Sequence, residues 1–150
     1  PAYRSIKNSE ITEIEIDNGK LRLLAGTFNG SEGYISRYLP LDYYDIHLNP
    51  GASLSIETER ERSVMVFTLS GDAYISGEAV KEKTAVKLSA GDYAEIKSTD
   101  KSAQILFVSS TLLSEPVAWG GPIVMNTREE LNTAFDDLKR GTFLKSGISY

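Results

Sequence analysis

Several residue types that would point directly to a function are missing or scarce in this chain of 150 residues. It has no cysteine, which excludes disulfide bonds and thiolate zinc sites and leaves the redox compartment undetermined. It has one histidine, His47, too few for an iron or manganese site that depends on several imidazoles. No apolar run approaches the ~20 residues that span a membrane, and we expect no signal peptide.

The charge and length of the chain narrow its partners further. Its net charge of −5 would repel a phosphate backbone, so we expect no direct binding to nucleic acid. We expect a cytoplasmic protein that does not bind membranes. The length predicts a single domain over residues 1–150. The first residue is Pro1 and not methionine, from which we expect a processed chain or a fragment of a longer one.

Short apolar segments separated by turns fill the first 110 or so residues and predict β-strands. Tyr44, Ile46 and Leu48 alternate with polar neighbours, which is the period of a half-buried strand. The segment 64–69 is apolar on both faces and is expected deep in a sheet. The predicted strands are 21–26, 34–39, 43–48, 64–69, 73–76, 84–88, 93–96 and 105–108, and the alternation also resumes at Leu54 and Ile56 after the turn at 49–51. Strands at such regular spacing predict a sandwich or barrel.

One helix is predicted, from Arg128 to Arg140. Thr127 and Glu130 have the spacing of a capping box, and Gly141 is suited to end the helix. The apolar residues 131, 134, 135 and 138 form one stripe. We expect this stripe, including Phe135 and Leu138, to be buried where the helix docks on the outside of the barrel.

The segment from Gly51 to Gly71 resembles the first metal-binding motif of the cupins with its ligands replaced. That motif is a glycine, five residues, His-x-His, a glutamate, six residues and a second glycine. Its histidine positions fall on Glu57 and Glu59, and its glutamate position falls on Val64. The histidine of the second cupin motif falls on Ala94. We therefore predict no metal, no cofactor-binding residue and no catalytic residue in this chain.

Three acidic or imidazole side chains are nonetheless candidate ligands. Glu57 and Glu59 could together bind a hard cation such as calcium or magnesium. The preferred interpretation is an exposed acidic loop beside Arg60 and Arg62, because buried carboxylates are rare. His47 lies outside both motifs, and its strand parity places it opposite Ile46 and Leu48. It is expected to be a surface or hydrogen-bonded histidine.

The chain also resembles the carboxy-terminal domain of the pirin family. The resemblance rests on Glu-Pro-Val at 115–117, on Gly-Pro-Ile-Val-Met-Asn-Thr at 121–127, and on the segments 45–52 and 67–75. It implies an all-β cupin, RmlC-like in fold, with an antiparallel β-barrel or jelly roll and one carboxy-terminal α-helix. It also implies that the iron site and the quercetin 2,3-dioxygenase activity of some members belong to an amino-terminal cupin. No residue of this chain corresponds to those ligands.

Two kinds of function remain open from the sequence. The first is a metal-free, non-catalytic structural module that partners a metal-bearing amino-terminal cupin. The second is a stand-alone cupin that binds a small aromatic ligand in a tyrosine-lined lumen, or a co-regulator that acts through protein contacts. Trp119 could anchor an interface or cover one end of the barrel. The apolar tail residues Phe143, Leu144, Ile148 and Tyr150 favour a homodimer.

Overall fold

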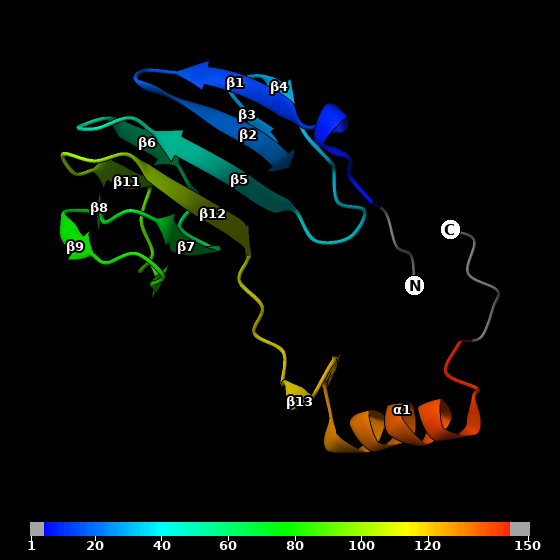
Figure 1. The fold of residues 1–150 in the computed structure, drawn as a ribbon. Helices are drawn as coiled ribbons and strands as arrows, with labels where there is room; N and C mark the ends of the chain where they lie inside the picture. The colour runs from blue at the N-terminus through cyan, green and yellow to red at the C-terminus, as the bar shows by residue number, and fades with distance from the viewer. Residues whose placement is uncertain (1–4, 145–150) are drawn as a thin grey trace. The chain divides into compact units, whose positions relative to one another are not determined.

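The computed structural model describes residues 5–144, which fall into a larger and a smaller unit, each with its own core (Figure 1). The larger unit comprises residues 6–112 and contains the long strands. Among the described residues, the smaller unit comprises Ser5 and residues 113–144, which contain a hairpin and the helix. The prediction of a single domain over residues 1–150 stays a prediction.

Two antiparallel sheets make up most of the larger unit. The first has the order β1-β2-β5-β12-β7-β10 and the second the order β6-β11-β8-β9. The strands of the first sheet are β1 Thr12–Ile16, β2 Gly19–Ala25, β5 Leu41–Leu48, β12 Ala103–Thr111, β7 Arg62–Ser70 and β10 Ala85–Lys87. Those of the second are β6 Ser53–Glu57, β11 Tyr93–Ser98, β8 Ala73–Ile75 and β9 Glu78–Val80. A 3-10 helix, Asn8–Glu10, precedes β1, and β3 Thr27–Phe28 pairs with β4 Ser31–Glu32.

One hydrophobic core joins the inner faces of the two sheets. Tyr44, Ile46 and Leu48 enter it from β5, as their alternation predicts, and Ala94 and Ile96 enter it from β11. The ring of Tyr44 stacks on Phe107 with a centroid distance of 5.3 Å. The predicted all-β jelly roll with one carboxy-terminal helix is thereby confirmed, with the strands in open sheets.

Two strand predictions need correction. No strand covers 34–39, where Tyr34 makes only an isolated bridge to Ala25 and the following residues are mostly exposed. Gly33 and Pro40 flank this segment, and its apolar and polar residues do not alternate as they do in a half-buried strand. The segment 64–69 is not buried on both faces, because Met65 is 44% exposed while Val64 and Val66 are buried. Its second apolar face is the outer face of the six-stranded sheet.

The smaller unit packs the helix α1 Arg128–Arg140 against a hairpin of β13 Ala118–Gly120 and β14 Ile123–Met125. The predicted helix bounds are confirmed. The Thr127 hydroxyl accepts a hydrogen bond from the Glu130 amide at 3.2 Å, and the Glu130 carboxylate accepts one from the Thr127 amide at 2.9 Å. Gly141 ends the helix with a φ of 72°.

The burial of the helix stripe differs from its prediction. Leu131 and Ala134 are buried, Phe135 is half-buried against the hairpin core, and Leu138 is 47% exposed. The stripe is narrower than expected because a two-stranded hairpin covers it and β13 approaches closely at Gly120. A Cβ on Gly120 would come within 3.0 Å of Phe135 and 3.1 Å of Leu131.

The terminal segments fall partly outside the described residues. Phe143 packs on the core of the smaller unit, and Leu144 is exposed. Ile148 and Tyr150, which supported the predicted dimer, lie outside the described residues, as does Tyr3.

Candidate functional site

The residues of the cupin motif lie around the link between β6 and β7. Glu57 ends β6 and Glu59 lies in the turn that follows, and both are exposed, as expected. They border a depression of about 350 Å³ that is also lined by Thr27, Asp42, Thr58, Arg62 and Ser109. These residues come from segments far apart in the sequence and form the first candidate site.

An arginine–aspartate pair occupies this depression. The Arg62 Nε donates a hydrogen bond to the Ser109 hydroxyl at 2.7 Å, and its Nη2 donates to the Ser109 carbonyl at 3.2 Å. The same Nη2 also donates to the Asp42 carboxylate. The side chains of Arg62 and Asp42 are only 13% and 24% exposed. Sheet register brings them together, because Ser109 on β12 lies opposite Asp42 on β5.

Tyr44, two residues after Asp42 on β5, lies near this pair. Its hydroxyl donates to the Thr27 carbonyl at 2.6 Å. Burial raises the pKa of Tyr44 far above its ordinary value, and the nearby Asp42 carboxylate raises it further. The phenol is therefore a neutral donor near pH 7 and not an anionic ligand.

The other two motif positions lie inside the core. Val64 and Ala94 are buried members of the central hydrophobic cluster, and Ala94 lies opposite Ile56 in the sheet. Within residues 5–144, no group of three or more His, Cys, Asp or Glu side chains is arranged to hold a metal ion. An iron or manganese ion does not fit the four motif positions, because Val64 and Ala94 are apolar and Glu57 and Glu59 are exposed carboxylates, so none of them supplies an imidazole.

His47 belongs to a separate polar cluster on the outer face of the six-stranded sheet. It lies opposite Ile46 and Leu48, as predicted, and its Nε2 is 3.2 Å from Oδ1 of Asp45. Asp45 is itself buried and accepts hydrogen bonds from the Gln104 amide at 2.8 Å and from Arg22 at 3.1 Å.

The pKa of Asp45 reflects two opposing influences. Burial raises it, but the hydrogen bond from Gln104 and the neighbouring His47 and Arg22 outweigh burial, so the pKa lies below its ordinary range. Sequence reasoning missed this cluster. The only signal available was the alternation that places residues 45 and 47 on one face of a strand.

Side chains fill the space between the two sheets, and the tyrosines do not line a cavity there. Tyr44 is buried in the core, whereas Tyr38, Tyr74 and Tyr93 are exposed. An aromatic ligand in the lumen, as the alternative function requires, would have to displace this core.

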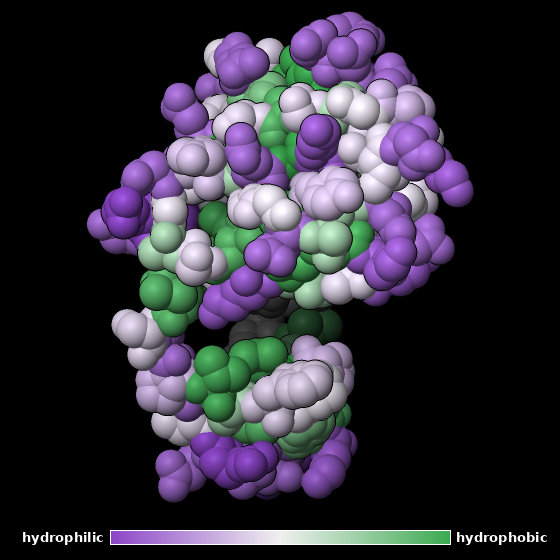
Figure 2. All heavy atoms as spheres, turned by 90° about the vertical axis from the view of Figure 1, so that its left-hand side faces the viewer, coloured by the Kyte–Doolittle hydropathy of each residue, from purple (hydrophilic) through white to green (hydrophobic). Residues whose placement is uncertain are grey.

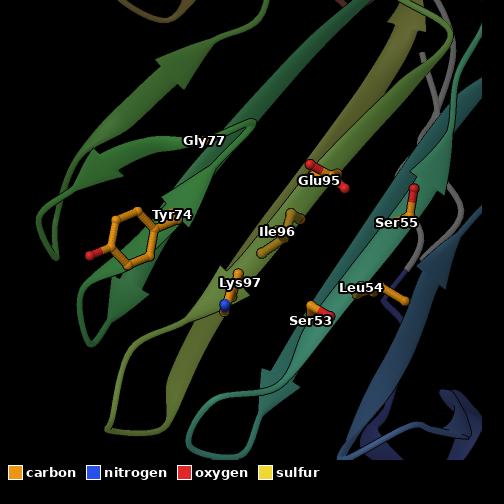
Figure 3. A pocket seen from close by; sticks show the side chains of 8 residues that line it. All are labelled: Ser53, Leu54, Ser55, Tyr74, Gly77, Glu95, Ile96 and Lys97. Atoms are coloured by element: carbon orange, nitrogen blue, oxygen red, sulfur yellow. The ribbon is translucent and has the colours of Figure 1, made fainter.

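A second depression, of about 500 Å³, lies on the four-stranded sheet (Figure 3). It is lined by Ser53, Leu54, Ser55, Tyr74, Gly77, Glu95, Ile96 and Lys97. Sequence reasoning did not find it, since none of these residues stands at a ligand position of the cupin motifs. Elsewhere in the described chain, the one α-helix is too short and too polar to cross a membrane.

Comparison with known proteins places the chain in a family. The model of the pirin C-terminal cupin domain matches residues 43–144. A Thermoplasma acidophilum protein provisionally named a quercetin 2,3-dioxygenase is 31% identical over 97% of this chain and 59% of its own length. Human pirin is 31% identical over 93% of this chain and 50% of its own length.

A solved structure agrees with these relatives. The crystal structure of a quercetin 2,3-dioxygenase from Acinetobacter baumannii superposes with a TM-score of 0.86 at 27% identity, covering 94% of this chain and 50% of that one. The chain thus spans about half the length of the relatives it matches. It belongs to the pirin family and corresponds to the carboxy-terminal cupin domain.

Proposed function

We propose that this domain is a metal-free, non-catalytic cupin that serves as the structural partner of a metal-bearing cupin of the pirin type. The observation that carries the proposal is the Arg62–Asp42–Ser109 cluster in the depression bordered by Glu57 and Glu59, which stand where the cupin motif has its histidines.

Electrostatics supports the absence of a metal. A divalent cation in this depression would face the Arg62 guanidinium, which is always protonated. Asp42, one of the three carboxylates that line the depression with Glu57 and Glu59, is already paired with Arg62. If a metal took Asp42 as a ligand, the largely buried Arg62 guanidinium would lose its carboxylate partner. Metal binding would have to offset the free-energy cost of that unpaired charge.

The hairpin of the smaller unit supports a structural partnership. Trp119 and Val124 lie opposite each other in the register of β13 and β14, and they are 71% and 59% exposed. Val117, two residues before Trp119, is exposed as well. Figure 2 shows green, hydrophobic side chains gathered on the surface of the smaller body. Such a cluster of apolar side chains is typical of a surface that a partner covers.

Metal analysis tests the first half of the proposal. The purified 150-residue chain is incubated with iron, zinc or manganese, dialysed and analysed for metal, alongside a cupin that has an intact histidine motif. We expect substoichiometric metal in this chain and no oxygen consumption with quercetin. Stoichiometric metal that a chelator removes, or quercetin turnover, would overturn the proposal.

Co-purification tests the second half. The amino-terminal half of the Thermoplasma acidophilum relative is expressed separately and mixed with this chain. We expect a complex that is weakened by Trp119→Thr and Val124→Thr. A complex that these substitutions leave unchanged would contradict the role of the hairpin, and the absence of any complex would contradict the partnership.

A further inference from the structure

The second depression lies on the outer face of the four-stranded sheet, away from the cupin motif. We propose that it binds a small zwitterionic ligand the size of a dipeptide, with an aromatic group at its carboxylate end. The proposal is independent of the function proposed above.

The sheet register arranges the lining side chains in two rows. Lys97 on β11 lies between Tyr74 on β8 and Ser53 on β6. One pleat further along β11, Glu95 lies opposite Ser55 of β6. All five side chains are on the exposed face, as Figure 3 shows around β11. One row therefore presents an ammonium, a hydroxyl and a phenol, and the other presents a carboxylate and a hydroxyl.

The two charges in this depression are unpaired. Within residues 5–144, no hydrogen bond or ion pair joins the side chain of Glu95 or of Lys97 to another residue. By contrast, the exposed lysine Lys81, which follows β9, forms an ion pair with Asp72 at 2.6 Å. A ligand can thus use both charges of the depression without first breaking a pair within the protein.

The distance between the two rows and the hydrogen-bonding groups of their side chains indicate the class of ligand. Residues two apart on a strand are separated by about 6.7 Å, which is also the span of an extended dipeptide between its ends. Lys97 and Ser53 can donate to a carboxylate, while Glu95 and Ser55 can accept from an ammonium. The Tyr74 ring, beside Lys97, offers a face for an aromatic side chain at the carboxylate end. The volume of about 500 Å³ is within the range of small-molecule sites.

Titration of the 150-residue chain with glycyl-phenylalanine, followed by amide chemical shifts, tests the proposal. We expect saturable shifts confined to β6, β8 and β11. N-acetyl-glycyl-phenylalanine lacks the ammonium and glycyl-phenylalanine amide lacks the carboxylate, so each should bind about threefold to tenfold more weakly. Equal binding of all three compounds would overturn the proposal, as would shifts that map to other strands.

Matched variants assign the roles of the side chains. Lys97→Met should weaken binding of the free dipeptide about threefold to tenfold but barely change binding of the dipeptide amide. Glu95→Gln should weaken binding of the free dipeptide to a similar extent but barely change binding of the N-acetylated compound. Lys87→Met, at an exposed lysine on β10, should leave all affinities unchanged. The amide spectrum reports whether each variant is folded. Folded Lys97→Met and Glu95→Gln variants with native affinity would show that the charges play no part.

Discussion

At the scale of single residues, the Arg62–Asp42 pair gives the most direct test of the proposed function. Asp42→Ala leaves the guanidinium of Arg62 largely buried without its carboxylate. We expect a loss of about 2–3 kcal/mol in the free energy of unfolding of the larger unit, less than a fully buried pair because some solvent reaches it. Denaturant unfolding followed by the amide signals of β5 and β12 measures this loss.

The double variant Asp42→Ala with Arg62→Met controls for the loss of packing. It removes both charges and keeps most of the arginine's apolar stem, so it should be more stable than Asp42→Ala alone. A single variant as stable as the native chain would show that the pair contributes little and that the depression tolerates a free cation.

Asp45 should make stability depend on pH at the acid end. Its pKa is depressed in the folded state, so its contribution is present above the unfolded value of about 3.9 and is lost as the pH falls through the lower folded value. Asp45→Asn should remove this part of the acid dependence and should cost about 1–3 kcal/mol near pH 7, because the buried group loses charged hydrogen bonds. Denaturant unfolding at a series of pH values below 5 checks both effects.

Asp72→Asn is the matched control for Asp45. The hydrogen bond from Lys81 also lowers the pKa of Asp72, but that carboxylate is exposed. Its effect on stability should be small and should disappear in high salt, because solvent and ions screen exposed charges. An equally large effect of Asp72→Asn would contradict the role given to the burial of Asp45.

At this scale, the sequence could predict the features that depend on neighbouring residues, but not those that depend on contacts between distant strands. The exposure of Glu57 and Glu59 and the orientation of His47 follow from strand parity and local polarity. The pairing of Arg62 with Asp42 and Ser109 does not, because it requires the order of β5, β12 and β7 in the sheet. The same holds for the rows of side chains around Glu95 and Lys97, which three strands bring together.

At the scale of elements, the helix was predictable from the sequence, whereas the prediction of a strand at 34–39 was wrong. A capping box, an apolar stripe and a terminal glycine all lie within residues 127–141, so their combined signal is local. The segment 34–39 has strand-like composition but lies between a glycine and a proline and pairs only through Tyr34. The strand β1 was missed, although Ile14 and Ile16 alternate with Glu13 and Glu15.

The helix should depend on Leu131 and not on Leu138. Leu131 is 2% exposed at the centre of the smaller core, so Leu131→Ala should lower the stability of this unit by about 2–4 kcal/mol, a large part of what so small a core supplies. Leu138→Ala, at an exposed position of the same helix, should cost less than about 0.5 kcal/mol. Hydrogen exchange of the α1 amides separates this unit from the larger one. Equal protection in both variants would contradict the observed packing of the helix.

At the scale of the whole molecule, the relatives are about twice as long as this chain. In them, further sequence accompanies the region that this chain matches, so we consider which surface of this chain a partner could cover. The hairpin presents Val117, Trp119 and Val124 on the face opposite the helix core, and the Trp119 indole is held by a 2.6 Å hydrogen bond to the Gly121 carbonyl. An oriented aromatic beside two valines is well suited to an interface, because little side-chain entropy is lost when a partner covers it.

We therefore expect the isolated chain to self-associate through this face, most simply as a two-fold dimer. Sedimentation velocity at micromolar concentration should show a species heavier than the 16.5 kDa monomer, and the double variant Trp119→Thr with Val124→Thr should shift it to monomer. Both substitutions keep a strand-forming residue in the hairpin, so the loss would reflect the surface and not the fold. Tyr93→Thr, which removes an exposed aromatic from β11 of the larger unit, is the control and should leave the dimer intact. A native chain that stays monomeric, or a dimer that only the Tyr93 substitution disrupts, would show that the hairpin face does not drive association.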